Sequence, residues 1–327
     1  MTTPGTEQVR GVRYRNPVYE GYFADPLVLK VGGEYFAYGT GPGDERGRQF
    51  PVLRSRDLAR WEYVGHALER VTPYQHWAPE VAWHEGKFYL YYSASDVESD
   101  EGHRLRVAVG ENPAGPFKDS GNLLLPEAGF SIDAHPFRDP HSGRWYLYFA
   151  ADFTENEPYG TGLAVVELND DLVSVRGKAK VVVRASCPWQ VYERNRNYKG
   201  RVWAAWNCLE GPFVVYRDGR YYCLYSGGNW QTEDYGVGFA VAEDPLGPWR
   251  DDSARHGPVV LKATKDVPGP GHASVTIAPD ERTQMLVYHA WDQGRTARRM
   301  CIDPLEWTAE GPRCDGPSTE ERVVAGG

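Results

Sequence analysis

The sequence has few cysteines, no long apolar run and no excess of basic residues, and each shortage excludes a class of protein. Its five cysteines, an odd number without a C-x-x-C pair, argue against a zinc site and a disulfide framework. No apolar stretch approaches the length of a transmembrane helix. With 36 Lys and Arg against 45 Asp and Glu, the net charge of −9 argues against nucleic acid or a membrane surface as partner.

The first ten residues also lack the apolar segment of a signal peptide. We therefore expect a cytoplasmic protein, or a secreted one if an export signal precedes this sequence. No linker rich in Ser, Pro or Gly divides the 327 residues, which predicts a single domain with a core at about residues 16–317 and short polar tails. The sequence leaves the oligomeric state open.

A helical period is absent as well, whereas one short pattern recurs along the chain. Five times a carboxylate or histidine precedes alternating apolar and aromatic residues, a turn and an aromatic-rich run, with starts 53 to 77 residues apart. The copies begin at Asp25, Glu80, Asp133, Glu210 and His272. One supersecondary unit repeated every 40 to 60 residues or so is typical of a β-propeller, whose innermost strands line one channel. We therefore predict that five polar side chains face this channel at the same register.

The residues within each copy favour strands joined by tight turns. Runs such as residues 88–92, 145–149 and 221–225 are aromatic and bulky, as expected of strands buried in stacked sheets. Glycines at the connections suit hairpins that need positive φ. A third and a fourth strand follow each hairpin, so the prediction is an all-β, five-bladed propeller with four-stranded antiparallel blades. A β-sandwich is the alternative, but it does not explain polar residues recurring at one register.

The chain is rich in large aromatic side chains, with 11 Trp and 21 Tyr. Most of them are expected to pack one blade against the next. A few would suffice for a sugar-binding cleft, because the apolar face of a sugar ring stacks on an aromatic ring.

Carboxylates gathered in one channel suit the hydrolysis of a glycosidic bond. This reaction needs one carboxylic acid to protonate the leaving oxygen and one carboxylate to attack or to activate water. Asp25, Glu80, Asp133 and Glu210 are the candidates, and crowding is expected to keep one of them protonated near neutral pH. Each has a structural alternative, such as a turn at Asp25-Pro26 or a strand-entry kink after Glu210.

Five motifs around these residues resemble glycoside hydrolase family 43 in order and spacing. They comprise Gly21 to Pro26, Trp77 to Val81, Ser131 to His135, Leu209 to Pro212 and Gly269 to Ser274. The resemblance runs from about Asn16 to Pro317. It implies an inverting hydrolase on a five-bladed propeller, in which Asp25 is the general base, Glu210 the general acid and Asp133 the carboxylate that holds the acid's pKa and orientation.

The resemblance also implies further site residues. Trp77 matches an aromatic residue near the substrate, and Arg298 an arginine that reaches the pocket beside the base, although Arg295 and Arg299 are close enough to blur the register. We add Glu80 as a substrate-binding carboxylate of the channel. His272 matches a residue that holds a calcium ion on the propeller axis in many relatives, and its alternative is a hydrogen-bonded core histidine.

The implied substrates are short oligosaccharides from plant cell walls, and no organic cofactor is expected. Ala134 and Ala273 depart from the commonest family pattern and distance the chain from the endo-acting arabinanases. The favoured activity is an exo-acting α-L-arabinofuranosidase, followed by a β-D-xylosidase and then an endo-1,5-α-L-arabinanase. A non-catalytic sugar-binding propeller ranks last, because nothing would offset the cost of burying three carboxylates.

Overall fold

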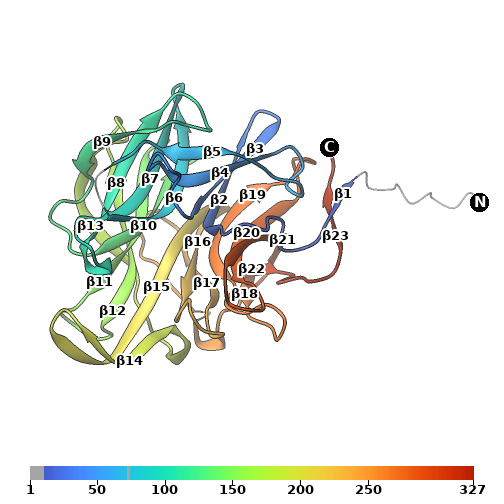
Figure 1. The fold of residues 1–327 in the computed structure, drawn as a ribbon. Helices are drawn as coiled ribbons and strands as arrows, with labels where there is room; N and C mark the ends of the chain where they lie inside the picture. Colours follow the sequence, from blue (N-terminus) through green and yellow to red (C-terminus); the bar gives the residue numbers. More distant parts are fainter. Residues whose placement is uncertain (1–10, 72–73, 253) are drawn as a thin grey trace, which may run out of the picture.

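The computed structural model describes residues 11–71, 74–252 and 254–327, and over these residues the chain is built of strands (Figure 1). Its helical turns are the short 3-10 segments η1 (Asp100–Gly102), η2 (Pro188–Gln190) and η3 (Ala254–His256). The all-β prediction is therefore confirmed. Within the described residues, no helix has the length and apolar character needed to cross a membrane. Residues 1–10, on which we looked for a signal peptide, lie outside this part of the chain.

The strands follow one another in antiparallel series of four. Three of these series are separate sheets: β2 (Ala24–Val31) to β5 (Glu62–Leu68) through β3 (Glu34–Thr40) and β4 (Gln49–Ser55); β6 (Tyr74–His84) to β9 (Lys118–Leu123) through β7 (Lys87–Ser95) and β8 (His103–Gly110); and β19 (Gly271–Ile277) to β22 (Gly311–Cys314) through β20 (Gln284–Trp291) and β21 (Arg298–Thr308).

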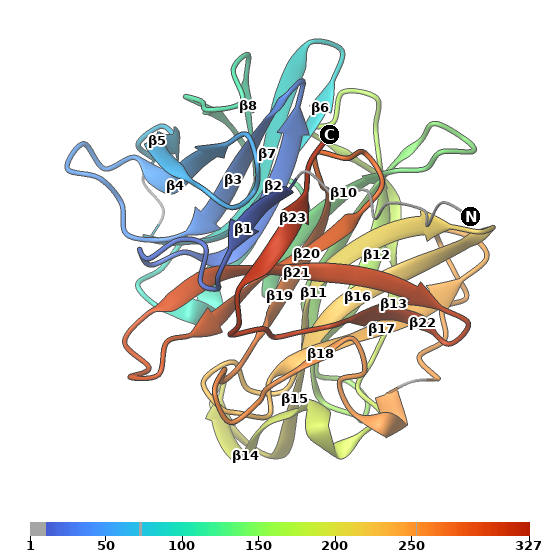
Figure 2. The same cartoon turned by 90° about the vertical axis from the view of Figure 1, so that its right-hand side faces the viewer.

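Two further series are joined into one nine-stranded sheet. They are β10 (Ser131–Arg138) to β13 (Val175–Val183) through β11 (Trp145–Phe153) and β12 (Gly160–Leu168), and β15 (Arg201–Arg217) to β18 (Leu261–Lys262) through β16 (Arg220–Gly227) and β17 (Gly236–Ala242). A short parallel pairing of β12 with β15 links them. The strand β14 (Val191–Tyr198) pairs with the first half of β15 and forms a long hairpin at the lower edge of Figures 1 and 2.

The predicted hairpin turns are present where glycine permits positive φ. Glu85 and Gly86 between β6 and β7 have φ of 47° and 82°, and Asp218 and Gly219 between β15 and β16 have φ of 48° and 81°. Positive φ at both central residues is the mark of the type I′ turn, whose twist matches that of the flanking strands.

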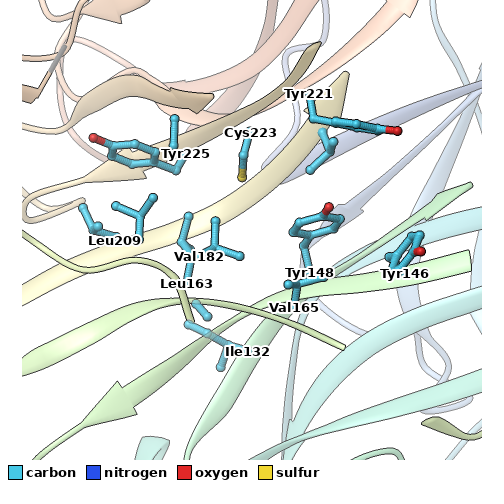
Figure 3. Close-up of a cluster of buried hydrophobic side chains, with 14 of the residues drawn as sticks. Ile132, Tyr146, Tyr148, Leu163, Val165, Val182, Leu209, Tyr221, Cys223 and Tyr225 are labelled. Atoms are coloured by element: carbon cyan, nitrogen blue, oxygen red, sulfur yellow. The ribbon is translucent and has the colours of Figure 1, made fainter. Parts of the chain in front are cut away.

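The hydrophobic core lies between neighbouring series of strands, as the aromatic runs predicted. Figure 3 shows one cluster, in which Tyr148 and Leu163 from β11 and β12 pack with Leu209, Cys223 and Tyr225 from β15 and β16. Another cluster joins β2, β3 and β4 to β20 and β21, so the last series packs against the first. The innermost strands β2, β6, β10, β15 and β19 lie against one another in the same cyclic order.

The two ends of the described chain meet beside the first and last series. The strands β1 (Gly11–Tyr14) and β23 (Arg322–Ala325) pair antiparallel, side by side in Figure 2. The segment after β1 then follows β21, where the Phe23 N–H donates to the Arg298 carbonyl over 2.9 Å. This pairing fixes the entry to β2 beside Arg298.

Candidate active site

Each innermost strand carries a β-bulge in its pairing with the next strand, and one residue of each bulge has a left-handed backbone. The register of each pairing shifts at this point. Because a bulge re-aims the side chain it carries, the repeated bulges turn successive strands toward a common axis. The residues with positive φ are Asp25 (51°), Ala78 (49°), Asp133 (58°), Gly211 (58°) and His272 (48°).

The bulges correct the predicted register at two of the five positions. Asp25, Asp133 and His272 occupy the bulge position, as expected. In β6 that position belongs to Ala78, two residues before Glu80, and in β15 it belongs to Gly211, one residue after Glu210. The shared register of five polar residues was therefore wrong for Glu80 and Glu210, which reach the interior from neighbouring positions.

Asp25 is a buried carboxylate surrounded by nitrogen atoms. Its Oδ1 lies 3.2 Å from Nη1 of Arg298, 3.3 Å from Nδ1 of His289 and 3.4 Å from Nδ1 of His272. Burial alone would raise the pKa of Asp25, but the charges of Arg298 and then of His272 outweigh it and hold the pKa well below the usual value. Asp25 therefore stays ionised at neutral pH.

His289 supports Asp25 as a neutral ring. The Asp25 N–H donates to Nδ1 of His289 over 3.0 Å, so the neutral ring carries its proton on Nε2. Burial is the main reason why the pKa of His289 falls to about 4.

Asp133 has the opposite electrostatic environment. Its Oδ2 accepts the Gly211 N–H over 2.9 Å and lies 3.9 Å from Nδ1 of His272. Burial is the main reason why the pKa of Asp133 rises to about 7; His272 lowers it, and the carboxylates of Glu210 and Asp25 raise it. Asp133 is thus the carboxyl group whose pKa rises to near neutrality, and it lies one hydrogen bond away from the backbone beside Glu210.

Glu210 is half-buried and is held by a hydrogen-bond donor at each carboxylate oxygen. The Tyr235 hydroxyl donates to Oε1 over 2.7 Å, and the Cys208 thiol donates to Oε2 over 3.1 Å. Neither partner was predicted from the sequence. Cys208 precedes Glu210 by two residues on one strand, so the two-residue period placed it on the same face. Tyr235 directly precedes β17, and no local sequence pattern identifies it as a site residue.

Arg298 lies where the resemblance implied, at the start of β21 beside Asp25. Its Nε and Nη2 both donate to the Tyr22 hydroxyl, over 3.1 and 2.9 Å, and its Cζ lies 4.5 Å from the centre of the Trp230 ring. Its two arginine neighbours point elsewhere: Arg295 donates to the Gln231 carbonyl and pairs with Glu233, and Arg299 pairs with Asp292. Tyr22 and Trp230 were not predicted as site residues.

Glu80 and Trp77 do not join the group around Asp25. Glu80 is buried and its Oε2 lies 2.6 Å from Nδ1 of His135. Trp77 stacks on His103 with ring centres 3.6 Å apart. Trp77, Tyr22 and His76 line an open cleft of about 390 Å³, and Tyr22 connects this cleft to Arg298. Trp77 therefore lies at a cleft that is linked to Asp25 through Tyr22 and Arg298, whereas Glu80 pairs with His135 and does not line this cleft.

The residues around His272 do not form a ligand set for calcium on their own. In the part of the chain that the structure describes, no three His, Cys, Asp or Glu side chains come together as metal ligands. Calcium prefers six to eight oxygen ligands, and Nδ1 of His272 faces two carboxylates that His272 itself pairs with. Calcium bound through His272 stays a prediction.

We predict that Asp133→Asn raises the melting temperature more at pH 8 than at pH 5. A carboxyl whose pKa rises on folding stabilises the fold while it is protonated, and this contribution is lost as pH rises from about 4 through about 7. The amide stays neutral at both pH values. Calorimetry at the two pH values measures the difference.

The control for this experiment is Asp139→Asn. Asp139 is also buried, but hydrogen bonds from Ser142 and Tyr221 outweigh the effect of burial and lower its pKa. Its contribution is present at both pH 5 and pH 8, so its loss should be similar at both. Equal shifts for Asp133→Asn at the two pH values would contradict the protonation state assigned to Asp133.

Comparison with known proteins identifies the family. The model of the glycosyl hydrolases family 43 matches residues 14–312. The chain is 28% identical to the β-D-galactofuranosidase xynD of Aspergillus niger, over 90% of this chain and 83% of that protein. It is 30% identical to an extracellular exo-α-(1→5)-L-arabinofuranosidase of Streptomyces chartreusis, over 86% of this chain and 83% of that protein.

Solved structures agree with this match. The crystal structure of a thermostable family-43 glycoside hydrolase superposes with a TM-score of 0.80 at 32% identity, covering 95% of this chain and 99% of that one. The strands thus have the arrangement of a β-propeller, and the enzyme prediction is confirmed. The chain belongs to glycosyl hydrolase family 43 and is a glycosidase.

Proposed function

We propose that this glycosidase is an inverting, exo-acting α-L-arabinofuranosidase on a five-bladed propeller. The observation that carries the base role is the ionisation of Asp25: Arg298 and His272 keep this buried carboxylate charged, so it can accept a proton from water. Glu210, on a different innermost strand, is the partner proposed to donate a proton. The ring of packed series, closed by the cluster between β2–β4 and β20–β21, supports the blade count.

The proposed chemistry assigns one step to each carboxyl group. Asp25 accepts a proton from water as the water oxygen bonds to the anomeric carbon. Glu210 gives its proton to the glycosidic oxygen, which leaves with the electron pair of the broken bond. Asp133 fixes the Gly211 N–H and hence the backbone beside Glu210. Arg298 holds Asp25, and Tyr22, which is hydrogen bonded to Arg298, lines the cleft together with Trp77, where a sugar ring is expected to stack.

The proposed substrate rests on the activities of similar proteins. Arabinofuranosidases appear among them by name, including the protein of Streptomyces chartreusis. The xylosidase alternative is supported by a xylosidase/arabinosidase of Humicola insolens, 24% identical over 88% of this chain, although the chain spans only about half of that protein. The galactofuranosidase of Aspergillus niger adds a third sugar to compare.

One experiment separates these substrates. Initial rates are measured on the 4-nitrophenyl glycosides of α-L-arabinofuranose, β-D-xylopyranose and β-D-galactofuranose. We expect the highest kcat/KM on the arabinofuranoside, and monosaccharide as the first product from an arabino-oligosaccharide. A higher kcat/KM on either other glycoside would overturn the substrate, and oligosaccharides as first products would overturn exo action.

Asp25→Asn is predicted to remove turnover, because an amide cannot accept the proton of the attacking water. The expected loss in kcat is about 10²–10⁴-fold. Stability should fall as well, since Arg298 and His272 lose the charge that they surround. Asp139→Asn, which removes a buried carboxylate remote from these residues, should keep the rate. A variant with more than about a tenth of the wild-type rate would remove Asp25 from the base role.

Glu210→Gln is predicted to impair substrates according to their leaving groups. An arabino-oligosaccharide needs a proton on the departing oxygen, so its kcat/KM should fall by about 10²-fold or more, while an activated aryl glycoside should be affected far less. The rate of the variant should also lose the decline that the wild-type enzyme shows at high pH. Equal losses on both kinds of substrate would show that Glu210 is not the acid.

For calcium, we predict that a chelator lowers the melting temperature or the rate and that added calcium restores it, because an ion bound only by the folded state stabilises it. His272→Ala should resemble the chelated enzyme. If exhaustive chelation changes neither quantity and elemental analysis finds no calcium, His272 serves only as a hydrogen-bonded residue between Asp25 and Asp133.

A further inference from the structure

The two carboxylate oxygens of Glu210 have partners of very different strength. Oε1 faces the hydroxyl of Tyr235 at 2.7 Å, and Oε2 faces the thiol of Cys208 at 3.1 Å. A phenol is a strong donor to a carboxylate, whereas a thiol is a weak donor. Burial, the largest influence, and the nearby Glu210 carboxylate raise the pKa of both the Tyr235 hydroxyl and the Cys208 thiol far above the usual values, so both groups keep their protons.

A chain of hydrogen bonds gives the Tyr235 proton a direction. The backbone N–H of His272 can only donate, and it donates to Oγ of the fully buried Ser226 over 2.7 Å. Ser226 is hydrogen bonded to Tyr235, whose single proton goes to the stronger acceptor, Oε1 of Glu210. The Ser226 proton then points at the Tyr235 oxygen. The order is therefore His272 N–H, Ser226, Tyr235, Glu210.

We propose that Tyr235 and Ser226 keep Oε1 of Glu210 as an acceptor, so that the proton transferred to the leaving group is carried by Oε2, beside Cys208. This inference rests on the proposed role of Glu210 as the acid. Tyr235, Ser226 and Cys208 are positioning residues in it, because they act through Glu210.

The arrangement assists the step in two ways. With Oε1 occupied, the carboxyl group presents its proton from one oxygen in one orientation. The Oε2–H bond then breaks as its proton passes to the glycosidic oxygen, and the negative charge left on Glu210 is shared with Oε1, where the Tyr235 O–H already points. A donor aligned before the charge develops needs no reorganisation during the reaction. The weak thiol donor, in turn, leaves Oε2 free to bind the proton.

The test compares variants on substrates with different leaving groups. Tyr235→Phe should lower kcat/KM on an arabino-oligosaccharide by about 10- to 100-fold, the size of effect typical of a misplaced catalytic group, and on 2,4-dinitrophenyl α-L-arabinofuranoside by less than about 3-fold. The loss should appear in kcat rather than in KM. Ser226→Ala should give the same pattern with a smaller loss.

The matched control is Tyr221→Phe. Tyr221 is another buried tyrosine of the same series of strands, and its hydroxyl also donates to a carboxylate, that of Asp139, over 2.7 Å. Its loss should lower the melting temperature without changing the ratio of the two kcat/KM values. This control separates damage to the fold from damage to the acid.

Cys208 gives a second and independent arm. Cys208→Ser places a stronger donor at Oε2, which competes with the proton there, so it should reduce the rate on the oligosaccharide but not on the aryl glycoside.

The outcomes are distinguishable from a failure of the proposed function. If Glu210→Gln shows no dependence on the leaving group, Glu210 is not the acid and the proposed function fails first. If Glu210→Gln shows that dependence but Tyr235→Phe and Ser226→Ala lower both rates equally, or neither, the assignment of the proton to Oε2 is overturned. A leaving-group effect in both variants, absent from Tyr221→Phe, supports it.

Discussion

The site depends on a backbone constraint that recurs in every innermost strand. A left-handed residue inside a strand costs about 1–3 kcal/mol unless it is glycine, and in four of these strands the residue is not glycine. The surrounding pairs of each strand continue on both sides of the bulge and hold it in place. The exception, Gly211, lies so close to His272 that an added β-carbon would be 3.1 Å from the ring.

The bulges bring charged side chains together near the axis, and Asp25 and Asp133 have different polar partners there. His272 lies between Asp25 and Asp133, but Arg298 reaches only Asp25, and the backbone N–H of Gly211 reaches only Asp133. One guanidinium therefore decides which carboxyl group stays ionised. Arg298 is in turn oriented by Tyr22 and by the pairing of the N-terminal segment with β21. The contacts that join the N-terminal segment to β21 therefore also place Arg298 beside Asp25.

Much of the fold was predictable because its signals are local. Aromatic alternation, glycine turns and the order of the repeated motifs all lie within short windows, and the strands follow them. Asp25, Asp133 and Arg298 were also placed correctly beside the axis. The register at Glu210 was missed because the repeats were aligned on polar residues. Proline is the better marker, since it directly follows the bulge residue in Asp25-Pro26, Ala78-Pro79 and Gly211-Pro212.

The remaining site residues are set by tertiary contacts that leave no trace in a short window. Tyr235 lies 25 residues after Glu210 and meets it only because β15 and β17 flank β16. Tyr22 and Trp230 both contact Arg298, although the three residues are far apart in the sequence. The pairing of Glu80 with His135 could likewise not be predicted from a short stretch of sequence, because His135 belongs to the next innermost strand, β10.

The central claim is that Asp25 activates water rather than attacking the sugar, with Glu210 as its acid partner. The most direct measurement follows the anomeric configuration of the first product by proton NMR, in the minutes before mutarotation, on an arabinofuranoside of known configuration. The account predicts that the first sugar released has the opposite anomeric configuration to the substrate. A product of retained configuration would mean that a carboxylate bonds to the sugar, and it would contradict the roles of both Asp25 and Glu210.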